Sequence, residues 1–291
     1  MNKMSKRAIF LYNKKSGRAT IAQKAHKIVN ILRQGGYDAT GEVIDFTRDQ
    51  LEGRGEFDLV VVAGGDGTVN YVVNVMKQGG VKARLGIIPA GTANDFALAL
   101  GMSKNPLKAA QQIATGVVDR VDCGYVNGLF FVNVFSFGVF TTTSQRTPDA
   151  LKHRLGKLAY IIEGIKELNA LHDMDLRIAA DDKTFRIKSL MVLVLNGKTA
   201  GGFQLARKAS VTDGKFDCLI LEQQSFVSAI YSAFIYILGG RPSKIRYINA
   251  SNIQILSDEN EPTDADGQRG VDFPLNIECL RGELEIVIPR E

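Results

Sequence analysis

The first third of the chain alternates short apolar runs with longer segments in which apolar residues recur every three or four positions. Short apolar runs are typical of buried strands, and the three-to-four spacing is typical of helices with one buried face. Strands that alternate with helices predict an open α/β sheet flanked by helices. The predicted strands span residues 7–12, 39–45, 57–63, 84–88 and 117–122, and the predicted helices span 19–35, 68–77, 92–100 and 105–115.

The pattern changes near residue 123, where apolar and polar residues begin to alternate. The segment GYVNGLFFVNVFSFGV has an Asn-Gly pair between two alternating runs, which is typical of a hairpin. Most of the remaining chain also alternates, which predicts a mainly antiparallel second domain, a sandwich or a barrel. Strand patterns lie at 175–181, 184–196, 215–221, 244–256, 274–280 and 283–289, and helical patterns lie at 149–170 and 225–238.

The length of 291 residues is more than one hydrophobic core usually holds, which also favours two domains. We expect an α/β domain over residues 1–123 and a β-sandwich domain over 124–280. Residues 281–291 would pack back on the first domain. A hydrophobic share of 45% and a charged share of 23% are those of an ordinary globular protein.

A formal charge of +5 and a pI near 9.0 suit phosphate ligands or an anionic membrane, and equally suit a protein that contacts neither. No feature indicates nucleic-acid binding. The cysteines, Cys123, Cys218 and Cys279, lie far apart and outside any CxxC pair, so we expect structural thiols in a reducing compartment. The first apolar run is too short for a secretory signal, so we expect a cytoplasmic protein.

The longest apolar run is FVSAIYSAFIYIL at 226–238, which is shorter than the ~20 residues needed to span a bilayer. It is therefore not expected to be a transmembrane helix. Arg241, Lys244 and Arg246 follow it and could rest on anionic headgroups if the helix docked on a membrane. Because the run is apolar on nearly all sides, we expect burial against the sandwich instead.

The stretch VVVAGGDGTVN carries the first candidate chemistry, because a buried strand ends directly in glycines and an acid. Ligands of open α/β sheets bind at the carboxyl ends of strands, and a helix that begins near Thr68 would present free N–H groups to an anion. Asp66 would repel a phosphate, so it suggests Mg²⁺ or proton abstraction. An ordinary capped turn explains one Asp and one Gly, but not three glycines and an acid together.

A second strand ends in the same way, because residues 84–88 lead through Pro-Ala-Gly into a helix opened by Thr92, Asn94 and Asp95. Two such strand ends predict two neighbouring loops that face one ligand. The chain has no GxxxxGK[ST] loop, and no GxGxxG follows a strand. A bound nucleotide would therefore be held in another way.

GGDGT at 64–68 together with GTANDFA at 91–97 resembles the diacylglycerol kinase catalytic-domain superfamily, and the whole chain resembles its soluble bacterial lipid kinases. GGDGT alone is shared with NAD kinases and resembles the phosphofructokinase loop. GTANDFA and a late Asp-Gly element narrow the resemblance to lipid kinases. The other supporting segments are NKKSG at 13–17, VDCG at 121–124, NGLFFVNVFSFG at 127–138, NGKTAGGF at 196–203, TDGKFD at 212–217 and ADGQ at 265–268.

The resemblance implies an NAD-kinase-like three-layer α/β domain followed by an antiparallel β-sandwich, with ATP in the cleft and the lipid hydroxyl entering between the domains. It also implies the residues that would hold the nucleotide. These are Asn13, Ser16 and Gly17 in the first loop, Gly64, Gly65, Gly67 and Thr68 in the second, and Gly91, Thr92 and Asn94 in the third.

Three acids carry the implied chemistry. Asp66 would help to hold the catalytic Mg²⁺, linked through waters to Asp122, and Asp266 would be the general base. The TDGKFD turn resembles a structural Mg²⁺ site, with the Asp213 carboxylate and the carbonyls of Ser210 and Lys215 as ligands. An Asp-Gly hairpin turn needs no metal, so both interpretations of the turn stay open.

The chain departs from the family pattern at Gln268 and Tyr71, where glutamate is usual, and at the first loop, which lacks the usual proline. The resemblance favours phosphorylation of diacylglycerol to phosphatidic acid at the inner membrane face, and leaves monoacylglycerol, sphingoid and ceramide acceptors open. A kinase of a polar substrate such as NAD, or a non-catalytic binding module, is the alternative. An open sandwich edge would allow a homodimer. The three histidines, His26, His153 and His172, are not expected to be catalytic.

Overall fold

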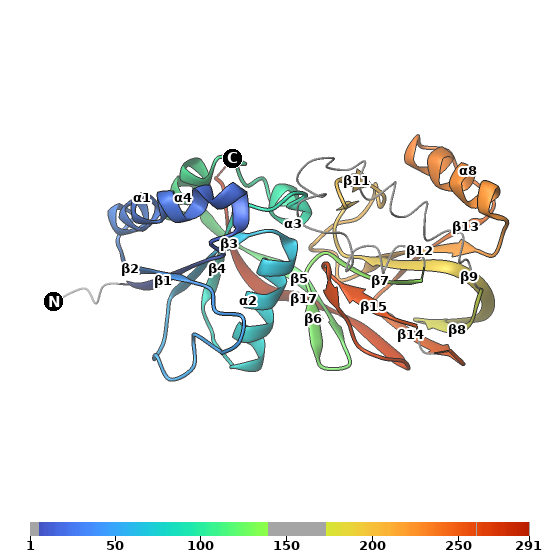
Figure 1. Cartoon of the computed structure of the whole chain (residues 1–291). Coiled ribbons are helices and arrows are strands. Elements are labelled where there is room, and N and C mark those ends of the chain that lie inside the picture. The colour runs from blue at the N-terminus through green and yellow to red at the C-terminus, as the bar shows by residue number, and fades with distance from the viewer. Residues whose placement is uncertain (1–5, 139–172, 260, 291) are drawn as a thin grey trace. The chain divides into compact units, whose positions relative to one another are not determined.

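The computed structural model describes residues 6–138, 173–259 and 261–290 (Figure 1). The contacts divide the chain into one unit of residues 1–121 and 282–291 and a second unit of residues 122–281. The predicted helix at 149–170, with His153 and His172, lies outside the described residues.

The first unit is built on a parallel sheet in the order β2-β1-β3-β4, which β17 extends at Ile286, opposite Leu85. Strand β3 is buried along its whole length, as expected for a central parallel strand that helices cover on both faces. The strands are β1 (Lys6–Tyr12), β2 (Tyr37–Val43), β3 (Leu59–Gly64), β4 (Arg84–Pro89) and β17 (Leu275–Ile288). The helices are η1 (Ser16–Ala19), α1 (Thr20–Gln34), α2 (Asp66–Gln78), α3 (Asp95–Ala99) and α4 (Pro106–Thr115).

Helices α1 and α4 pack together on one face of this sheet, and α2 lies on the other (Figure 1). Helix α1 buries an apolar stripe with Ile21, Ile28 and Leu32 at helical spacing. Helix α4 begins at Pro106, and the side chain of Asn105 accepts the N–H groups of Leu107 and Lys108. The carboxyl ends of β1, β3 and β4 are therefore held at one edge of a covered sheet.

The second unit is formed by antiparallel strand pairs. Strand β9 (Lys183–Leu195) pairs with β8 through its first half and with both β7 and β12 through its second half. The other elements are β5 (Val117–Val126), β6 (Leu129–Phe131), β7 (Val134–Gly138), β8 (Met174–Ala180), β10 (Thr199–Ala200), β11 (Phe203–Gln204), β12 (Phe216–Glu222), α8 (Phe226–Ile237), β13 (Ile245–Ala250), β14 (Asn252–Ser257), β15 (Thr263–Ala265) and β16 (Gln268–Arg269).

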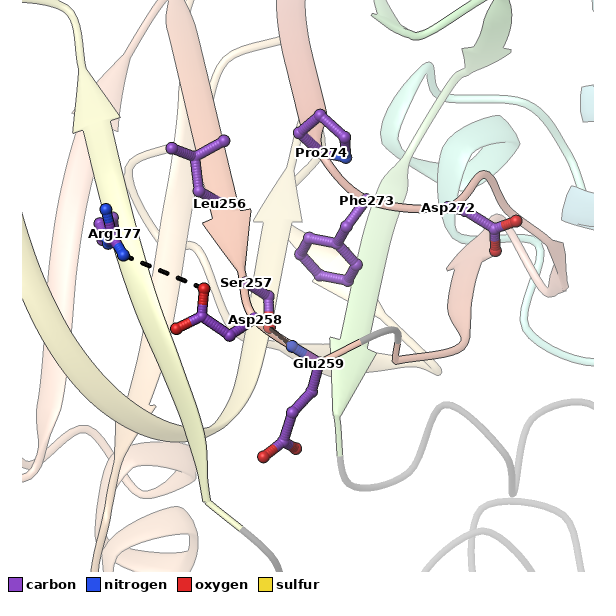
Figure 2. Close-up of a pocket in the computed structure, with 8 residues that line it drawn as sticks. All are labelled: Arg177, Leu256, Ser257, Asp258, Glu259, Asp272, Phe273 and Pro274. Atoms are coloured by element: carbon purple, nitrogen blue, oxygen red, sulfur yellow. Dashed lines mark hydrogen bonds and ion pairs between the residues drawn. The ribbon is translucent and has the colours of Figure 1, made fainter.

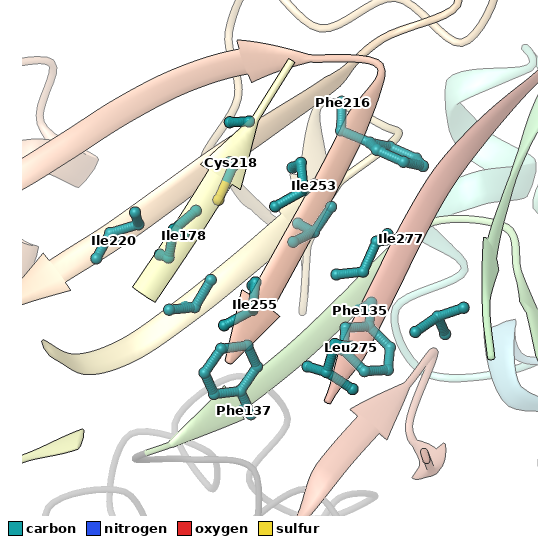
Figure 3. Packing of buried hydrophobic residues seen from close by; sticks show 14 of the residues in the cluster. Phe135, Phe137, Ile178, Phe216, Cys218, Ile220, Ile253, Ile255, Leu275 and Ile277 are labelled. Atoms are coloured by element: carbon teal, nitrogen blue, oxygen red, sulfur yellow. The ribbon is translucent and has the colours of Figure 1, made fainter. Parts of the chain in front are cut away.

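Alternate residues of these strands form the core of the second unit (Figure 3). Ile253 and Ile255 of β14 point into it, as do Leu275 and Ile277 of β17, while their neighbours face outward. The rings of Phe131 and Phe216 stack with their centroids 5.3 Å apart. An α/β fold followed by a sandwich-like β fold confirms the predicted fold class.

Helix α8 does not lie where the sequence analysis expected. Most of its large apolar side chains are exposed, so the expectation that the helix is buried against the sandwich is wrong. Among the described residues, none of the helices has both the length and the apolar character required to cross a membrane. All three cysteines are buried, and burial raises the pKa of Cys218 and of Cys279 to about 12, which agrees with unreactive thiols.

Candidate phosphate loops and acidic residues

Three loops of the first unit meet at the carboxyl edge of its sheet. The N–H of Asn13 donates to the Ala63 carbonyl at 3.1 Å, and the N–H of Gly17 donates to the Ala90 carbonyl at 2.7 Å. The N–H of Ala90 in turn donates to the Gly64 carbonyl at 2.9 Å. The structure therefore brings together the segments at the ends of β1, β3 and β4. The ten residues predicted to hold the nucleotide lie in these segments, including the end of β3, the short helix η1 and the first turn of α2.

Two glycines permit this close approach. A Cβ on Gly91 would lie 2.3 Å from the Cα of Gly65, so the backbones of the second and third loops touch where any side chain would separate them. Gly64 has the same constraint for another reason, because a Cβ there would lie 2.4 Å from the Cβ of Thr68. Thr68, in the first turn of α2, thus packs against the end of β3 and is buried.

Replacing Gly91 with alanine will force these two loops apart. Overpacking a rigid contact costs typically ~1–3 kcal/mol, and we expect the upper end because the obstructing atom is backbone. Thermal unfolding will measure the loss, and Gly80→Ala is the control, because no atom lies within 4 Å of the added Cβ and only its positive φ of 64° adds strain. A Gly91→Ala protein that melts like the wild type would contradict the close loop contact.

Asp66 connects the second loop to the third. Its Oδ1 accepts the N–H of Phe96 at 3.1 Å, and its Oδ2 accepts the N–H of Asp95 at 3.2 Å. The carboxylate therefore caps α3 as well as lying among the glycines. Asp95, which is itself buried, was not assigned a role from the sequence, although its acidic side chain at the start of a helix was visible there.

Asn94 shapes the third loop from within. Its backbone is left-handed, with φ 55°, and both ends of its side-chain amide bind Gly91: Oδ1 accepts the N–H at 2.6 Å and Nδ2 donates to the carbonyl at 2.9 Å. The ligand role of Asn94 stays a prediction, and both contacts of its side-chain amide are to Gly91 of the same loop. Thr92 and Gly91 are exposed beside it, and Ser16 is half-buried.

The start of α2 suits an anion. Its N-cap residue is Gly65, so no side chain there can bond the N–H groups of the first turn. The N-terminus of a helix carries a partial positive charge, and glycines let a ligand approach the backbone. These features fit the phosphates of a nucleotide, and the Asp66 carboxylate beside them suits a cation that would separate it from the phosphates.

In the second unit, Asp266 is held by three backbone N–H groups. Its Oδ2 accepts from Val132 at 2.6 Å, and its Oδ1 accepts from Asn133 at 2.9 Å and Val134 at 2.8 Å. Its own N–H donates to the Val134 carbonyl at 2.9 Å, and its backbone is left-handed, with φ 52°. The predicted base is therefore fixed in orientation and almost fully buried.

Asp122 is also buried and belongs to the second unit. Its Oδ2 accepts the N–H of Gly214 at 2.6 Å, so it holds the TDGK turn. Nδ2 of Asn196 donates to the carbonyls of Asp122 and Val132 at 2.9 Å each. Asn196 thus links the strand that carries Asp122 to the loop that holds Asp266. Sequence reasoning missed it, although an Asn before a Gly at a strand end was a usable signal.

Negative charge gathers at the TDGKFD turn. The exposed Asp213 accepts the N–H of Lys215 at 3.1 Å, and the hydroxyls of Ser210 and Thr212 lie 3.1 Å apart. The pKa of Asp217 is raised to about 6, mainly by burial; a hydrogen bond from Asn249 lowers it, and the nearby charge of Asp213 adds a smaller increase.

This charge is compatible with a cation at the turn, where Asp213, Ser210 and Lys215 were predicted as ligands. No group of three His, Cys, Asp or Glu side chains arranged to bind a metal occurs within residues 6–138, 173–259 and 261–290. A metal at this turn would therefore depend on backbone carbonyl groups beside the single carboxylate of Asp213, and the site stays a prediction.

A pocket of about 420 Å³ opens elsewhere on the second unit (Figure 2). Arg177 and Asp258 line it as an ion pair 3.9 Å apart, and Phe273 and Pro274 are among its apolar lining residues. None of the residues predicted to bind or react with a substrate lines this pocket, so its position gives them no support.

Two of the three departures from the family pattern, Tyr71 and Gln268, have different surroundings. The hydroxyl of Tyr71 donates to the carbonyls of Asp45 at 3.2 Å and Arg48 at 3.0 Å, so it braces the loop after β2, and burial raises its pKa. Gln268 is exposed on the short strand β16, paired with Ala265.

Family models match both parts of the chain. Residues 7–126 match the model of the diacylglycerol kinase catalytic domain, and residues 133–288 match the YegS C-terminal NAD kinase beta sandwich-like domain. The chain is 33% identical to a diacylglycerol kinase of Bacillus subtilis over 98% of this chain and 97% of that protein. It is 31% identical to the diacylglycerol kinase of Staphylococcus saprophyticus over 99% of this chain and 97% of that protein.

Solved structures share the fold. A crystal structure of a diacylglycerol kinase from Bacillus anthracis matches with a TM-score of 0.76 at 22% identity, over 99% of this chain and 98% of that chain. A second structure from the same organism matches with a TM-score of 0.83 at 24% identity, over 99% and 97%. The structural likeness concerns the fold, and the sequence matches carry the assignment: the chain belongs to the diacylglycerol kinase family.

Proposed function

We propose that this protein is an ATP-dependent lipid kinase that phosphorylates the free hydroxyl of diacylglycerol and forms phosphatidic acid. Family membership supports lipid kinase activity. The observation that supports ATP as phosphoryl donor is the contact between the loops after β1, β3 and β4. In this contact Gly65, the N-cap residue of α2, lies against Gly91 of the loop after β4. Backbone N–H groups and glycines at such an edge would hold phosphate oxygens.

The acids would divide the remaining work. Asp66 would lie beside the phosphates, oriented by its two bonds to the start of α3. Bound Mg²⁺, held in part by Asp66, would neutralise phosphate charge. Asp266 would accept the proton of the attacking hydroxyl, and its three N–H bonds would keep the carboxylate oriented. Asp122 would act through the turn that it holds at Gly214.

The test is a turnover assay with purified protein, ATP and Mg²⁺ against diacylglycerol, monoacylglycerol, sphingosine and ceramide in mixed micelles, with NAD as a polar acceptor. We expect phosphatidic acid as the main product. Turnover of NAD alone would contradict lipid specificity. No turnover on any acceptor, in a protein that still binds ATP, would indicate a binding module.

A further inference from the structure

Helix α8 has the reverse of the usual arrangement, because its small and polar side chains face the protein. The hydroxyls of Ser228 and Ser232 both donate to Oε1 of Gln224, at 2.8 and 3.0 Å, and Ala229 is buried between them. The hydroxyl of Tyr236 donates to the Leu205 carbonyl at 2.8 Å. These contacts fix which side of the helix points inward.

Six large apolar side chains at this helix point outward. Val227 is 74% exposed, Tyr231 64%, Phe234 58% and Leu238 67%, and Ile230 and Ile237 are each 39% exposed. Their spacing of three and four residues places them on one face of the helix. A contiguous stripe of this kind on a globular surface marks an interaction site, because single exposed apolar residues are common and a stripe is not.

The surroundings of this face are basic. The chain has Arg241, Lys244 and Arg246 but no acidic residue between positions 223 and 250. Arg207 donates to the carbonyl of Ile237 at 3.0 Å, which places a further guanidinium group at the C-terminal end of α8. Glu222 offsets part of this charge, because it pairs with Arg246 at 3.1 Å and lies 3.9 Å from Lys244.

We propose that α8 docks this protein on a lipid bilayer that contains anionic headgroups. The helix would lie in the plane of the interface, with Val227, Tyr231, Phe234 and Leu238 among the acyl chains and the basic residues at headgroup level. With 12 residues it is about 18 Å long, which suits a helix that lies in the interface. The inference rests on the proposed function, because a lipid kinase must reach an acceptor that resides in a membrane.

The charge distribution favours a bilayer over a second copy of this chain. If the α8 faces of two copies met, Arg241, Lys244 and Arg246 of both copies would also come close together and repel one another. The 223–250 segment has no carboxylate that could neutralise this positive charge. An anionic membrane neutralises the charge of these basic residues. The apolar stripe and the basic residues would then bind the same bilayer.

The chain has no tryptophan, so a single introduced tryptophan reports on one place. In Phe234→Trp, we expect emission typical of a water-exposed indole in buffer and a blue shift with vesicles of equal parts phosphatidylglycerol and phosphatidylcholine. The matched control is Leu256→Trp on β14, where the parent side chain is 49% exposed, and its emission should not change. A blue-shifted emission of Phe234→Trp in buffer alone, with the protein monomeric, would show a covered face and overturn the proposal.

Vesicle sedimentation without ATP separates docking from catalysis. We expect Tyr231→Ser/Phe234→Ser to bind the anionic vesicles at least about tenfold more weakly than wild type, because two large apolar groups no longer enter the interface. Its turnover of short-chain diacylglycerol in detergent should match wild type, while turnover on vesicles falls.

Undiminished vesicle binding would overturn the docking proposal. Failure of the proposed kinase function would instead show as no turnover by the wild type in either form. A monomeric double variant beside a dimeric wild type would assign the face to a second copy.

Discussion

Replacing Asp266 with asparagine will lower activity and stability together. The carboxylate accepts three backbone N–H groups, and an asparagine would place its own NH₂ against at least one of them. Leaving buried donors without an acceptor costs ~1–3 kcal/mol, so we expect a melting temperature lower by roughly 2–12 °C. Loss of a general base lowers turnover by about 10²–10⁴-fold.

The two measurements separate the two roles of Asp266. A protein with a lowered melting temperature and activity within about tenfold of wild type would make Asp266 a structural brace and remove its assignment as base. Asp272→Asn is the control, because Asp272 is an exposed acid of the same unit, and it should leave both quantities unchanged.

Replacing Asp66 with asparagine will abolish most of the activity at a smaller cost in stability. The amide oxygen can still accept one of the N–H groups of Asp95 and Phe96, so we expect a loss of about 1–2 kcal/mol. The negative charge beside the phosphate loops is lost, and removal of one well-placed electrostatic group typically lowers turnover by about 10²–10³-fold.

Thermal unfolding with and without ATP and Mg²⁺ tests the same variant independently of turnover. Ligand binding stabilises the wild type in proportion to the logarithm of ligand concentration over Kd, and the gain should shrink in Asp66→Asn. The control is Asp58→Asn, because Asp58 also accepts a backbone N–H, from Arg7 at 2.8 Å, and has no assigned chemistry. An equal gain in wild type and Asp66→Asn would exclude Asp66 from the metal–nucleotide site.

The sequence was sufficient to predict the loops of the first unit, because each loop can be recognised from a few consecutive residues. Each loop follows a strand of the parallel sheet and contains a glycine, so the sheet itself brings the loops together at its carboxyl edge. The surroundings of Asp266 could not be predicted in this way. Its partners, Val132 to Val134, lie more than 130 positions away, and only the pairing of β15 with β7 places them beside it.

The orientation of α8 was predicted wrongly for a different reason. A helix that is apolar on nearly all sides gives no periodic signal, and hydropathy alone favours burial of the largest side chains. The deciding contacts were those of Ser228 and Ser232 with Gln224, which precedes the helix. Small hydroxyl side chains let the helix approach the protein closely, and most of the large residues lie on the outer face.

Strand β17 has a consequence for how the protein is made. It returns to the first unit at residue 282, so the sheet that begins with β1 receives its last strand only after the whole second unit has been synthesised. At roughly 5–20 residues per second, the intervening 160 or so residues separate the two events by about 8–30 s. During translation, the nascent first unit would thus expose the edge of β4 that later pairs with β17. A chaperone bound to that edge would protect it until β17 has been synthesised and can pair with β4.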